Sequence, residues 1–327
     1  MLKTSIIIPV KEINNYLRQE TIPALLEQTE KDFEIIIVTD KPSPEVFPKT
    51  VILPSYPKTG PADKRDLGAK KAGGEILAFL DDDSYPQKDW LEKALLNFSQ
   101  NSKISGVGGP TLTPPNDNLY RKASGYVWST WLGSGGAGTY RCAISSRRGI
   151  DDYPTVNFLV RKKDFWKVGG FDSHFWPGED TKLCHSLIYE LKKEIVYDPQ
   201  VIVFHHRRPV LRAHLEQIAR YAIHRGHFAK ILPKTSLRLG YLLPSFFVLG
   251  LFFGLILVII FRSFWLMAFY FLLSTFYFFL LFLTGFSIFL KEKNLKLAGL
   301  SMFSIVVTHF VYGILFIKGF FSQKLIR

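Results

Sequence analysis

The sequence is poor in cysteine, and acidic residues are almost missing from its last third. Only two cysteines, Cys142 and Cys184, occur among 327 residues. Two cysteines exclude a disulfide framework and a cysteine-based metal cluster, and they are typical of a protein in a reducing compartment. The apolar run at 5–10 is too short for a secretory signal and no small-residue cleavage site follows it, so we expect no signal peptide there.

Charge is distributed unevenly along the chain. Residues 1–204 hold 26 Lys/Arg and 26 Asp/Glu, so the formal net charge of +13 lies entirely in the last 123 residues. A nucleic-acid-binding protein carries its basic residues on the folded domain, so this distribution argues against nucleic acid as a partner. The hydrophobic fraction of 47% excludes a disordered chain.

The C-terminal part contains three long segments that lack any charged residue. They cover residues 239–261, 264–290 and 297–317. Each exceeds the ~20 residues that an α-helix needs to cross a ~30 Å hydrocarbon core. A buried helical hairpin in a soluble core is the alternative, and three consecutive segments of this length disfavour it. We therefore predict a multi-pass membrane protein.

Basic residues beside these segments predict their orientation. Lys and Arg are abundant in 205–238 and in the loop 291–296, and such residues favour the cytoplasmic side. We expect both stretches, and the domain before them, to be cytoplasmic. If all three segments cross, the C-terminus with Lys318, Lys324 and Arg327 lies outside, which conflicts with the same rule. The alternative is that the last segment does not fully cross.

Residues 1–204 alternate between short apolar runs and helix-length patterns. The apolar runs are at 5–8, 34–38, 51–53, 75–80 and 201–204, and the helical patterns are at 16–28, 62–72, 88–98 and 181–191. Apolar strands separated by helices predict an α/β domain with a mostly parallel sheet covered on both faces. Ligands bind such sheets at the carboxyl ends of the strands.

Three adjacent carboxylates, Asp81, Asp82 and Asp83, follow the apolar run at 75–80. In extended backbone, Asp81 and Asp83 point the same way and Asp82 points opposite. Adjacent acids repel one another, so the cluster favours a bound cation, and oxygen ligands favour Mg²⁺ or Mn²⁺. The alternative is ordinary capping of the helix at 88–98.

Two further polar groups follow expected strands or open a helix. Asp40 comes after the run at 34–38, where a carboxylate could accept a hydrogen bond from a nucleobase, or form an Asx turn instead. Lys64 and Arg65 lie at a helix start, which suits a diphosphate, although a Lys-Arg pair is more often surface charge.

An acidic pair, Glu179 and Asp180, precedes the helical pattern at 181–191. The pair could simply cap this helix. The chemical alternative is a general base on a rigid turn framed by glycines and aromatic residues. Local physics alone does not choose between the two.

Taken in order, these motifs resemble the family 2 glycosyltransferases, which have the GT-A fold. The matching stretches are 6–10, Asp40, 64–66, 81–83 and 179–180. The resemblance covers about two thirds of the chain. Asp66 departs from it, because the family often has Asn at that place.

The resemblance implies roles for these residues. Pro9 and Asp40 would hold the nucleobase, and Lys64, Arg65 and Glu179 would belong to the substrate site. The acids of the D-x-D motif would contact ribose and diphosphate through Asp81 and Asp82 and hold the metal through Asp83. Asp180 would be the catalytic base.

A fifth segment, from Gln217 to Tyr221, resembles the Q-x-x-R-W motif of membrane polysaccharide synthases, with Tyr221 in place of Trp. If the resemblance holds, Arg220 contacts the substrate diphosphate and Gln217 belongs to the substrate site. Apolar residues at helical spacing also predict an amphipathic interfacial helix over 211–230, whose cations face anionic lipid. Residues 205–208, which come after the expected strand at 201–204, are further candidates for contact with the phosphates.

Together these observations predict three domains: a catalytic domain at 1–204, a basic juxtamembrane segment at 205–238 and a transmembrane domain at 239–327. The predicted function is an inverting, metal-dependent glycosyltransferase of the cell membrane. It would transfer a sugar from a nucleoside-diphosphate sugar to a lipid-linked or membrane-associated acceptor. The alternatives are a processive polysaccharide synthase and an inactive, membrane-tethered sugar-nucleotide-binding protein.

Overall fold

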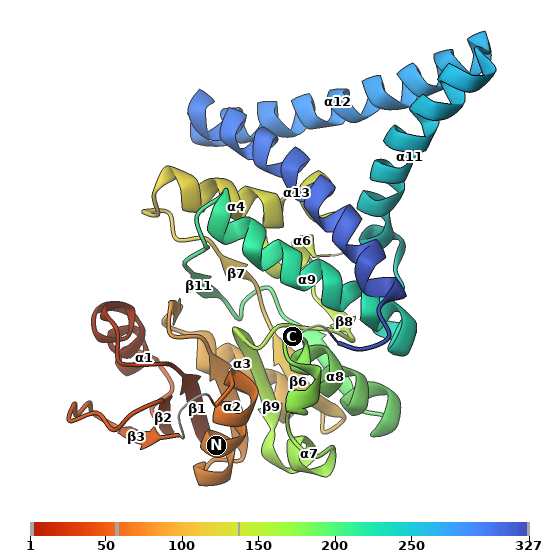
Figure 1. The fold of residues 1–327 in the computed structure, drawn as a ribbon. Coiled ribbons are helices and arrows are strands. Elements are labelled where there is room, and N and C mark those ends of the chain that lie inside the picture. The colour runs from red at the N-terminus through yellow and green to blue at the C-terminus, as the bar shows by residue number, and fades with distance from the viewer. Residues whose placement is uncertain (1–2, 56–58, 137, 326–327) are drawn as a thin grey trace. The chain divides into compact units, whose positions relative to one another are not determined.

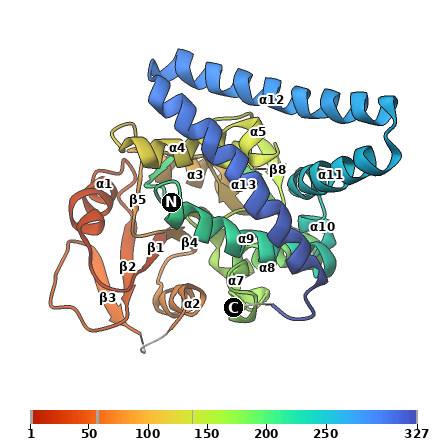
Figure 2. The same ribbon diagram turned by 45° about the horizontal axis from the view of Figure 1, so that its top comes forward.

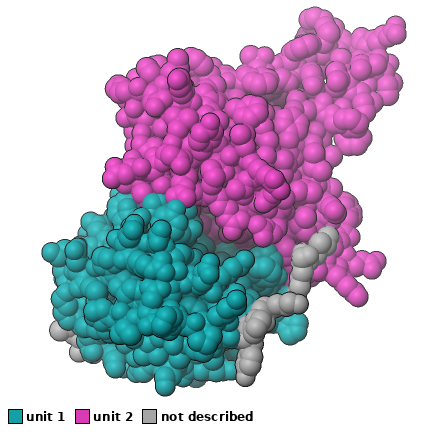
Figure 3. Space-filling model, turned by 60° about the vertical axis from the view of Figure 1, so that its left-hand side comes forward, with its two compact units in different colours: residues 1–112, 143–206 teal, residues 113–142, 207–327 magenta. Residues whose placement is uncertain are grey.

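The computed structural model describes residues 3–55, 59–136 and 138–325. The chain forms two compact units, shown in Figure 3. Unit 1 comprises Met1–Leu112 and Ala143–His206, and unit 2 comprises Thr113–Cys142 and Arg207–Arg327. The segment 113–142 therefore packs with the C-terminal third of the chain. The functional boundary at residue 204 stays a prediction.

Unit 1 is built on a mixed sheet of eight strands (Figure 1). Its order is β3-β2-β1-β4-β9-β6-β10-β8. The strands are β1 (Thr4–Pro9), β2 (Phe33–Thr39), β3 (Thr50–Pro54), β4 (Ile76–Leu80), β6 (Ile104–Gly108), β8 (Arg148–Ile150), β9 (Asn157–Arg161) and β10 (Glu194–Tyr197). Strands β3, β2, β1 and β4 pair in parallel, whereas β9 is antiparallel to both of its neighbours. The expected mostly parallel sheet is confirmed.

Helices cover both faces of this sheet. They are η1 (Leu17–Thr21), α1 (Ile22–Leu26), α2 (Pro61–Lys71), α3 (Trp90–Gln100), α7 (Lys162–Lys167), η2 (Ser173–Phe175), α8 (Glu179–His185) and η3 (Ser186–Glu190). Ile6 and Ile8 point toward α1 and α3, where they join the main apolar core. Ile7 points to the other face, against Gly68 of α2. This alternation follows from the period of two in a strand, and it buries both faces.

A small three-stranded sheet lies after the carboxyl end of β4. It consists of β5 (Ser84–Pro86), β11 (Val203–His205) and β7 (Thr111–Leu112) in the order β5-β11-β7. Strand β11 is antiparallel to β5, with His205 opposite Ser84. This pairing brings the end of β11 beside the acids that follow β4.

Unit 2 is helical. It contains α4 (Leu119–Ser129), α5 (Trp131–Ser134), α6 (Thr139–Cys142), α9 (Arg212–Ile231), α10 (Pro233–Ser236), α11 (Leu239–Phe261), α12 (Phe264–Glu292) and α13 (Leu295–Phe321). The last three have mean hydropathies of 2.7, 2.2 and 2.0 over their most apolar windows, and each is long enough to cross a membrane. The expected helix at 211–230 is present as α9. Figure 2 shows α9 running beside α13.

Candidate active site

The acidic cluster is fixed by the turn between β4 and β5. Strand β4 is wholly buried and ends at Leu80, so the acids begin where the chain leaves the core. The Ser84 hydroxyl and backbone N–H both donate to the carbonyl oxygen of Asp81, at 2.7 and 3.2 Å. These two hydrogen bonds close the turn and hold the carboxylates in place.

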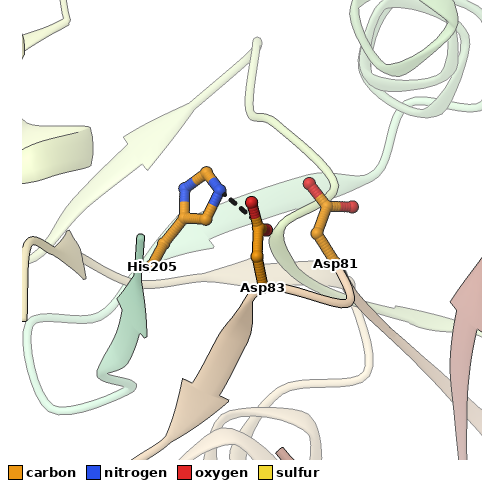
Figure 4. A group of neighbouring side chains, drawn as sticks. All are labelled: Asp81, Asp83 and His205. Atoms are coloured by element: carbon orange, nitrogen blue, oxygen red, sulfur yellow. Dashed lines mark ion pairs between the residues drawn. The ribbon is translucent and has the colours of Figure 1, made fainter. Parts of the chain in front are cut away.

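Asp81 and Asp83 point to the same side of this turn, where His205 meets them (Figure 4). The Nε2 atom of His205 lies 3.1 Å from Oδ1 of Asp83. Burial alone would raise the pKa of Asp83, but the charge of His205 and its hydrogen bond outweigh burial and hold that pKa below its usual value. One ligand atom from each of the three residues lies within 4.8 Å of the other two.

This donor set fits a divalent cation. Two carboxylate oxygens and one imidazole nitrogen lie close enough for one ion to reach all three residues. Hard carboxylate oxygens suit Mg²⁺ and Mn²⁺ alike, whereas an imidazole nitrogen is more usual for a transition metal such as Mn²⁺. The residues therefore fit the metal that the sequence analysis predicts for this place.

Asp82 has different neighbours. Its carboxylate accepts a hydrogen bond from the side-chain amide of Asn14, whose own oxygen accepts from the backbone N–H of Leu17 at the start of η1. Burial raises the pKa of Asp82 to about 6, and the charges of Asp83 and Asp81 add to this effect. Asn14 is a member of the site that the sequence does not predict.

Arg65 joins the two acidic motifs. Its guanidinium donates to Oδ1 of Asp81 at 2.8 Å and to Oε1 of Glu179 at 3.1 Å. The Arg65 side chain is only 6% exposed and that of Glu179 only 7% exposed, so this contact is shielded from water. A planar fork with several N–H groups can hold two carboxylates at once, which a lysine could not do in the same geometry.

Lys64, the neighbour of Arg65 on α2, reaches the ends of β1 and β2. Its ammonium group pairs with the carboxylate of Asp40 and donates to the carbonyl oxygen of Val10 at 2.6 Å. Pro9 is the last residue of β1 and is buried. The residues predicted to hold the nucleobase therefore gather around one buried cation, while their contact with a base stays a prediction.

Glu179 and Asp180 occupy the first turn of α8. The helix begins after Gly178, whose φ of 140° is a conformation that favours glycine. Glu179 turns inward and accepts from the N–H of Gly178 at 2.9 Å, whereas Asp180 accepts from the N–H of Thr181 at 2.8 Å. Glu179 is buried and Asp180 is half-buried, so the pair divides into an inner and an outer carboxylate.

Asp66, the residue that departs from the family pattern, supports the loop before α8. Its carboxylate accepts from the backbone N–H of Phe171 at 3.0 Å. Burial raises the pKa of Asp66 to about 6, although this hydrogen bond acts in the opposite direction. An Asn oxygen could accept the same hydrogen bond without a charge.

Gln217 and Arg220 lie on α9, in unit 2. Arg220 is exposed and donates to the carbonyl oxygen of Glu216 at 3.3 Å. Substrate binding by Gln217 and contact of Arg220 with the diphosphate stay predictions.

His205 is the member of the cluster whose role the sequence reasoning missed. It follows an expected strand, and the sequence indicated only an approach to the phosphates. The available signal was the position itself, since a histidine at a strand's carboxyl end can face other strand ends. The decisive pairing of β11 with β5 joins segments about 120 residues apart, and no local pattern shows it.

Residues 5–169 match the sequence profile of the family described as Glycosyl transferase family 2. The chain belongs to this family. This family 2 glycosyltransferase is 30% identical over 197 residues to a protein named Uncharacterized glycosyltransferase from Haemophilus influenzae, covering 57% of this chain and 62% of that protein. The chain therefore spans less than two thirds of this relative's length. It is also 22% identical over 225 residues to the Glucosyl-dolichyl phosphate glucuronosyltransferase of Haloferax volcanii. This match covers 62% of this chain and 69% of that protein.

The fold of this glycosyltransferase resembles that of the mannosyltransferase PcManGT from Pyrobaculum calidifontis, solved in complex with GDP-Man and Mn²⁺. The TM-score is 0.61 at 16% sequence identity, covering 96% of this chain and 87% of that one. The likeness confirms a GT-A-like sheet domain followed by long apolar helices. At this identity it shows the fold alone.

Proposed function

We propose that this enzyme is a membrane-anchored, inverting glycosyltransferase that uses a nucleoside-diphosphate sugar and a lipid-linked acceptor on the cytoplasmic face. The observation that carries the proposal is the single network that joins Asp81 and Asp83 to Glu179 through Arg65. It couples a cation-binding cluster to the turn that carries Asp180. Such a network holds a donor's diphosphate and a base in a fixed relation.

The donor's parts match the arrangement of these side chains. Asp40, which follows β2 and pairs with Lys64 of α2, suits the nucleobase. Asp82 lies next in the chain to the cation-binding acids and suits the ribose. Asp81, Asp83 and His205 would hold Mn²⁺ or Mg²⁺, which neutralises charge on the departing nucleoside diphosphate when bound. The imidazole of His205 favours Mn²⁺ over Mg²⁺.

Asp180 acts as the general base in this proposal. Its carboxylate takes the proton of the acceptor hydroxyl while that oxygen forms a bond to the anomeric carbon. The bond from the anomeric carbon to the phosphate oxygen breaks, and its electron pair leaves with the nucleoside diphosphate. One displacement from the opposite face inverts the anomeric centre. Arg65 holds Glu179, and with it the first turn of α8, in place.

The helices of unit 2 support a lipid-linked acceptor. Helices α11 and α12 expose apolar side chains along almost their whole length, which suits lipid. The Haloferax volcanii relative is named for a dolichyl phosphate substrate, which is consistent with an acceptor of this class. A membrane-bound acceptor keeps the reacting hydroxyl close to an anchored enzyme.

Asp180→Asn in the full-length enzyme tests the proposal. The variant keeps the shape and capping ability of the side chain but removes the base, so turnover should fall by about 10²–10⁴. Affinity for the nucleoside diphosphate, measured by calorimetry with Mn²⁺, should be unchanged.

Asp63→Asn is the matched control, because Asp63 is an exposed aspartate in the first turn of α2. It should leave both quantities unchanged. If Asp180→Asn and Asp63→Asn show the same turnover, Asp180 only caps its helix and the proposed mechanism is wrong.

A further inference from the structure

Helix α13 differs from the other two apolar helices in how much of it is covered by protein. In the most apolar window of α13, 39% of the residues are buried, against 6% in α11 and 6% in α12. The buried polar residues of α13 are Ser301, Ser304, Thr308 and His309. A helix surrounded by lipid does not need such a polar face, and in this structure protein covers it.

Helix α9 packs along one side of α13, and the two helices run in the same direction. Near the start of α9, His214 lies 3.0 Å from the hydroxyl of Thr308. Near its end, His227 lies 3.3 Å from the carbonyl oxygen of Ser322. Between these points the backbones touch, because a Cβ added at Gly226 would overlap the carbonyl oxygen of Phe316.

Helix α9 is too polar to cross a bilayer. Its 20 residues include five charged side chains spread over its whole length: Arg212, Glu216, Arg220, Arg225 and Lys230. Charged side chains at the centre of a bilayer are rare and costly. If α13 crossed the hydrocarbon core with this packing intact, α9 would have to cross beside it.

The first half of α13 is covered by α4 and α5. Ala123 belongs to one apolar cluster with Leu297, and Val127 belongs to another with Ile305. The ring of His309 contacts the carbonyl oxygen of Leu132 at 3.0 Å. Both ends of α13 are therefore packed against protein that carries charge, including Arg121 and Lys122 on α4.

We propose that α13 lies in the plane of the membrane surface, with one face on α9 and α4 and the other in contact with lipid. Only α11 and α12 then enter the bilayer, as a hairpin with its tip at Arg262 and Ser263. The C-terminus lies on the same side of the membrane as α9 and the loop that contains Lys293.

The docking of the hairpin agrees with this arrangement. The start of α11 packs on α13, where the Ser245 hydroxyl donates to the carbonyl oxygen of Gly313 at 3.0 Å. The end of α12 packs on the other half of α13, with Gly285 against Met302. The start of α11 and the end of α12, which are the two ends of the hairpin, therefore both pack on α13.

The arrangement also resolves the conflict in the charge distribution. Residues 205–327 contain 15 Lys and Arg. With two crossings, all of them except Arg262 lie on one side, where anionic headgroups attract them. With three crossings, Lys318, Lys324 and Arg327 would lie on the opposite side.

Depth measurement tests the in-plane orientation directly. Phe303, Phe310 and Ile314 lie on one face of α13 and are 56%, 38% and 53% exposed. Single-cysteine variants at these positions carry a nitroxide label in vesicles of phosphatidylcholine and phosphatidylglycerol. Collision with oxygen and with a water-soluble nickel complex reports the depth of each label. We expect three equal, shallow depths.

Helix α11 supplies a matched control. Leu249 and Ile260 are 38% and 65% exposed and are separated by the same 11 residues as Phe303 and Ile314. Labels at these two positions should differ in depth by ~16 Å, the axial length of 11 helical residues. If the α13 labels show the same gradient as the α11 labels, α13 crosses the membrane and the proposal is wrong.

Accessibility provides a second test that does not depend on depth calibration. Cysteines at Gln323, Lys296 and Ser263 are labelled in sealed vesicles with a reagent that does not cross membranes, and the parent chain reports background labelling. Positions 323 and 296 should react from the same side, and position 263 from the other side or from neither. Reaction of 323 from the side opposite to 296 would overturn the proposal.

Discussion

At the scale of single residues, His205 completes the candidate cation site. Its Nε2 lies 3.1 Å from Asp83, and both lie beside Asp81. We predict that His205→Ala weakens Mn²⁺ binding at least about tenfold, since it removes one of three ligands. Calorimetric titration of the full-length protein with Mn²⁺ measures this change.

His174→Ala is the control for this substitution, because His174 is an exposed histidine that pairs with Asp172 outside the cluster. It should bind Mn²⁺ as the unmodified protein does. Equal Mn²⁺ affinity of the two variants would show that His205 is not a ligand.

Asp66 links a buried charge to stability. Its pKa is raised from 3.8 to about 6 in the folded protein, chiefly by burial. A raised pKa means that the folded state holds the proton more tightly, so this contribution to stability is present below pH 4 and is lost as the pH rises through 6.

We therefore predict that Asp66→Asn stabilises unit 1 at pH 7.5 and has a much smaller effect at pH 4, close to the pKa of the unfolded carboxyl. The expected gain in the free energy of unfolding is about 1–2 kcal/mol. This is less than the full pKa shift of Asp66 implies, because the side chain is partly exposed to water. Thermal unfolding in detergent at both pH values measures it. A gain of equal size at both pH values would exclude the charge as its cause.

Part of the site was predictable at this scale. Asp81 and Asp83 share a side as the sequence predicts, but they do so in a turn closed by Ser84 and not in the extended backbone from which the prediction was argued. The pairing of Arg65 with Asp81 and Glu179 was not predictable, because it joins residues 16 and 114 positions away. The sequence indicated that Arg65 belongs to the site but not which groups it contacts.

At the scale of elements, the expected strands were those with continuous apolar runs. Strand β6 has no such run, since it contains Gly106 and Gly108, and the sequence analysis does not include it. The structure gives the reason for these glycines. A Cβ at Gly106 would overlap the ring of Phe158, and a Cβ at Gly108 would overlap the ring of Tyr153. Packing therefore requires glycine at both positions. The two glycines also interrupt the apolar run by which a strand is predicted from sequence.

The contact between α9 and α13 also depends on glycine. We predict that Gly226→Leu separates the two helices, because the new side chain would overlap the backbone of Phe316. Trypsin should then cut at the basic residues of α9 several-fold faster, and the thermal midpoint should fall by several degrees.

Gly299→Leu is the control for helix propensity, since Gly299 also lies inside a helix but has nothing within 4 Å of an added Cβ. It should resist trypsin as the unmodified protein does. Equal cleavage rates for the two variants would contradict the close packing at Gly226.

At the scale of the whole molecule, the two units interrupt each other in the sequence. Residues 113–142 pack with 207–327, although they lie between two parts of unit 1. We predict that a chain truncated after His206 aggregates without detergent, because the apolar face of α4 around Ala123 and Val127 loses its cover on α13.

A second truncation tests this reason. Replacing residues 113–142 by a short Gly/Ser linker in the same truncated chain should restore a monodisperse, soluble protein on size-exclusion chromatography. If both truncated chains are equally monodisperse, exposure of α4 does not matter. If both aggregate, unit 1 does not fold alone.

The contact between α4 and the end of α12 has a consequence for how the protein is made. Lys122 and Tyr126 hold Glu292, a residue 170 and 166 positions further along the chain. At a synthesis rate of ~5–20 residues per second, α4 waits roughly 10–30 s for these partners after it leaves the ribosome. During that interval the apolar face of α4 is not covered by α13. The nascent chain must therefore either place this face on the lipid surface or be bound by a chaperone until α13 has been synthesised.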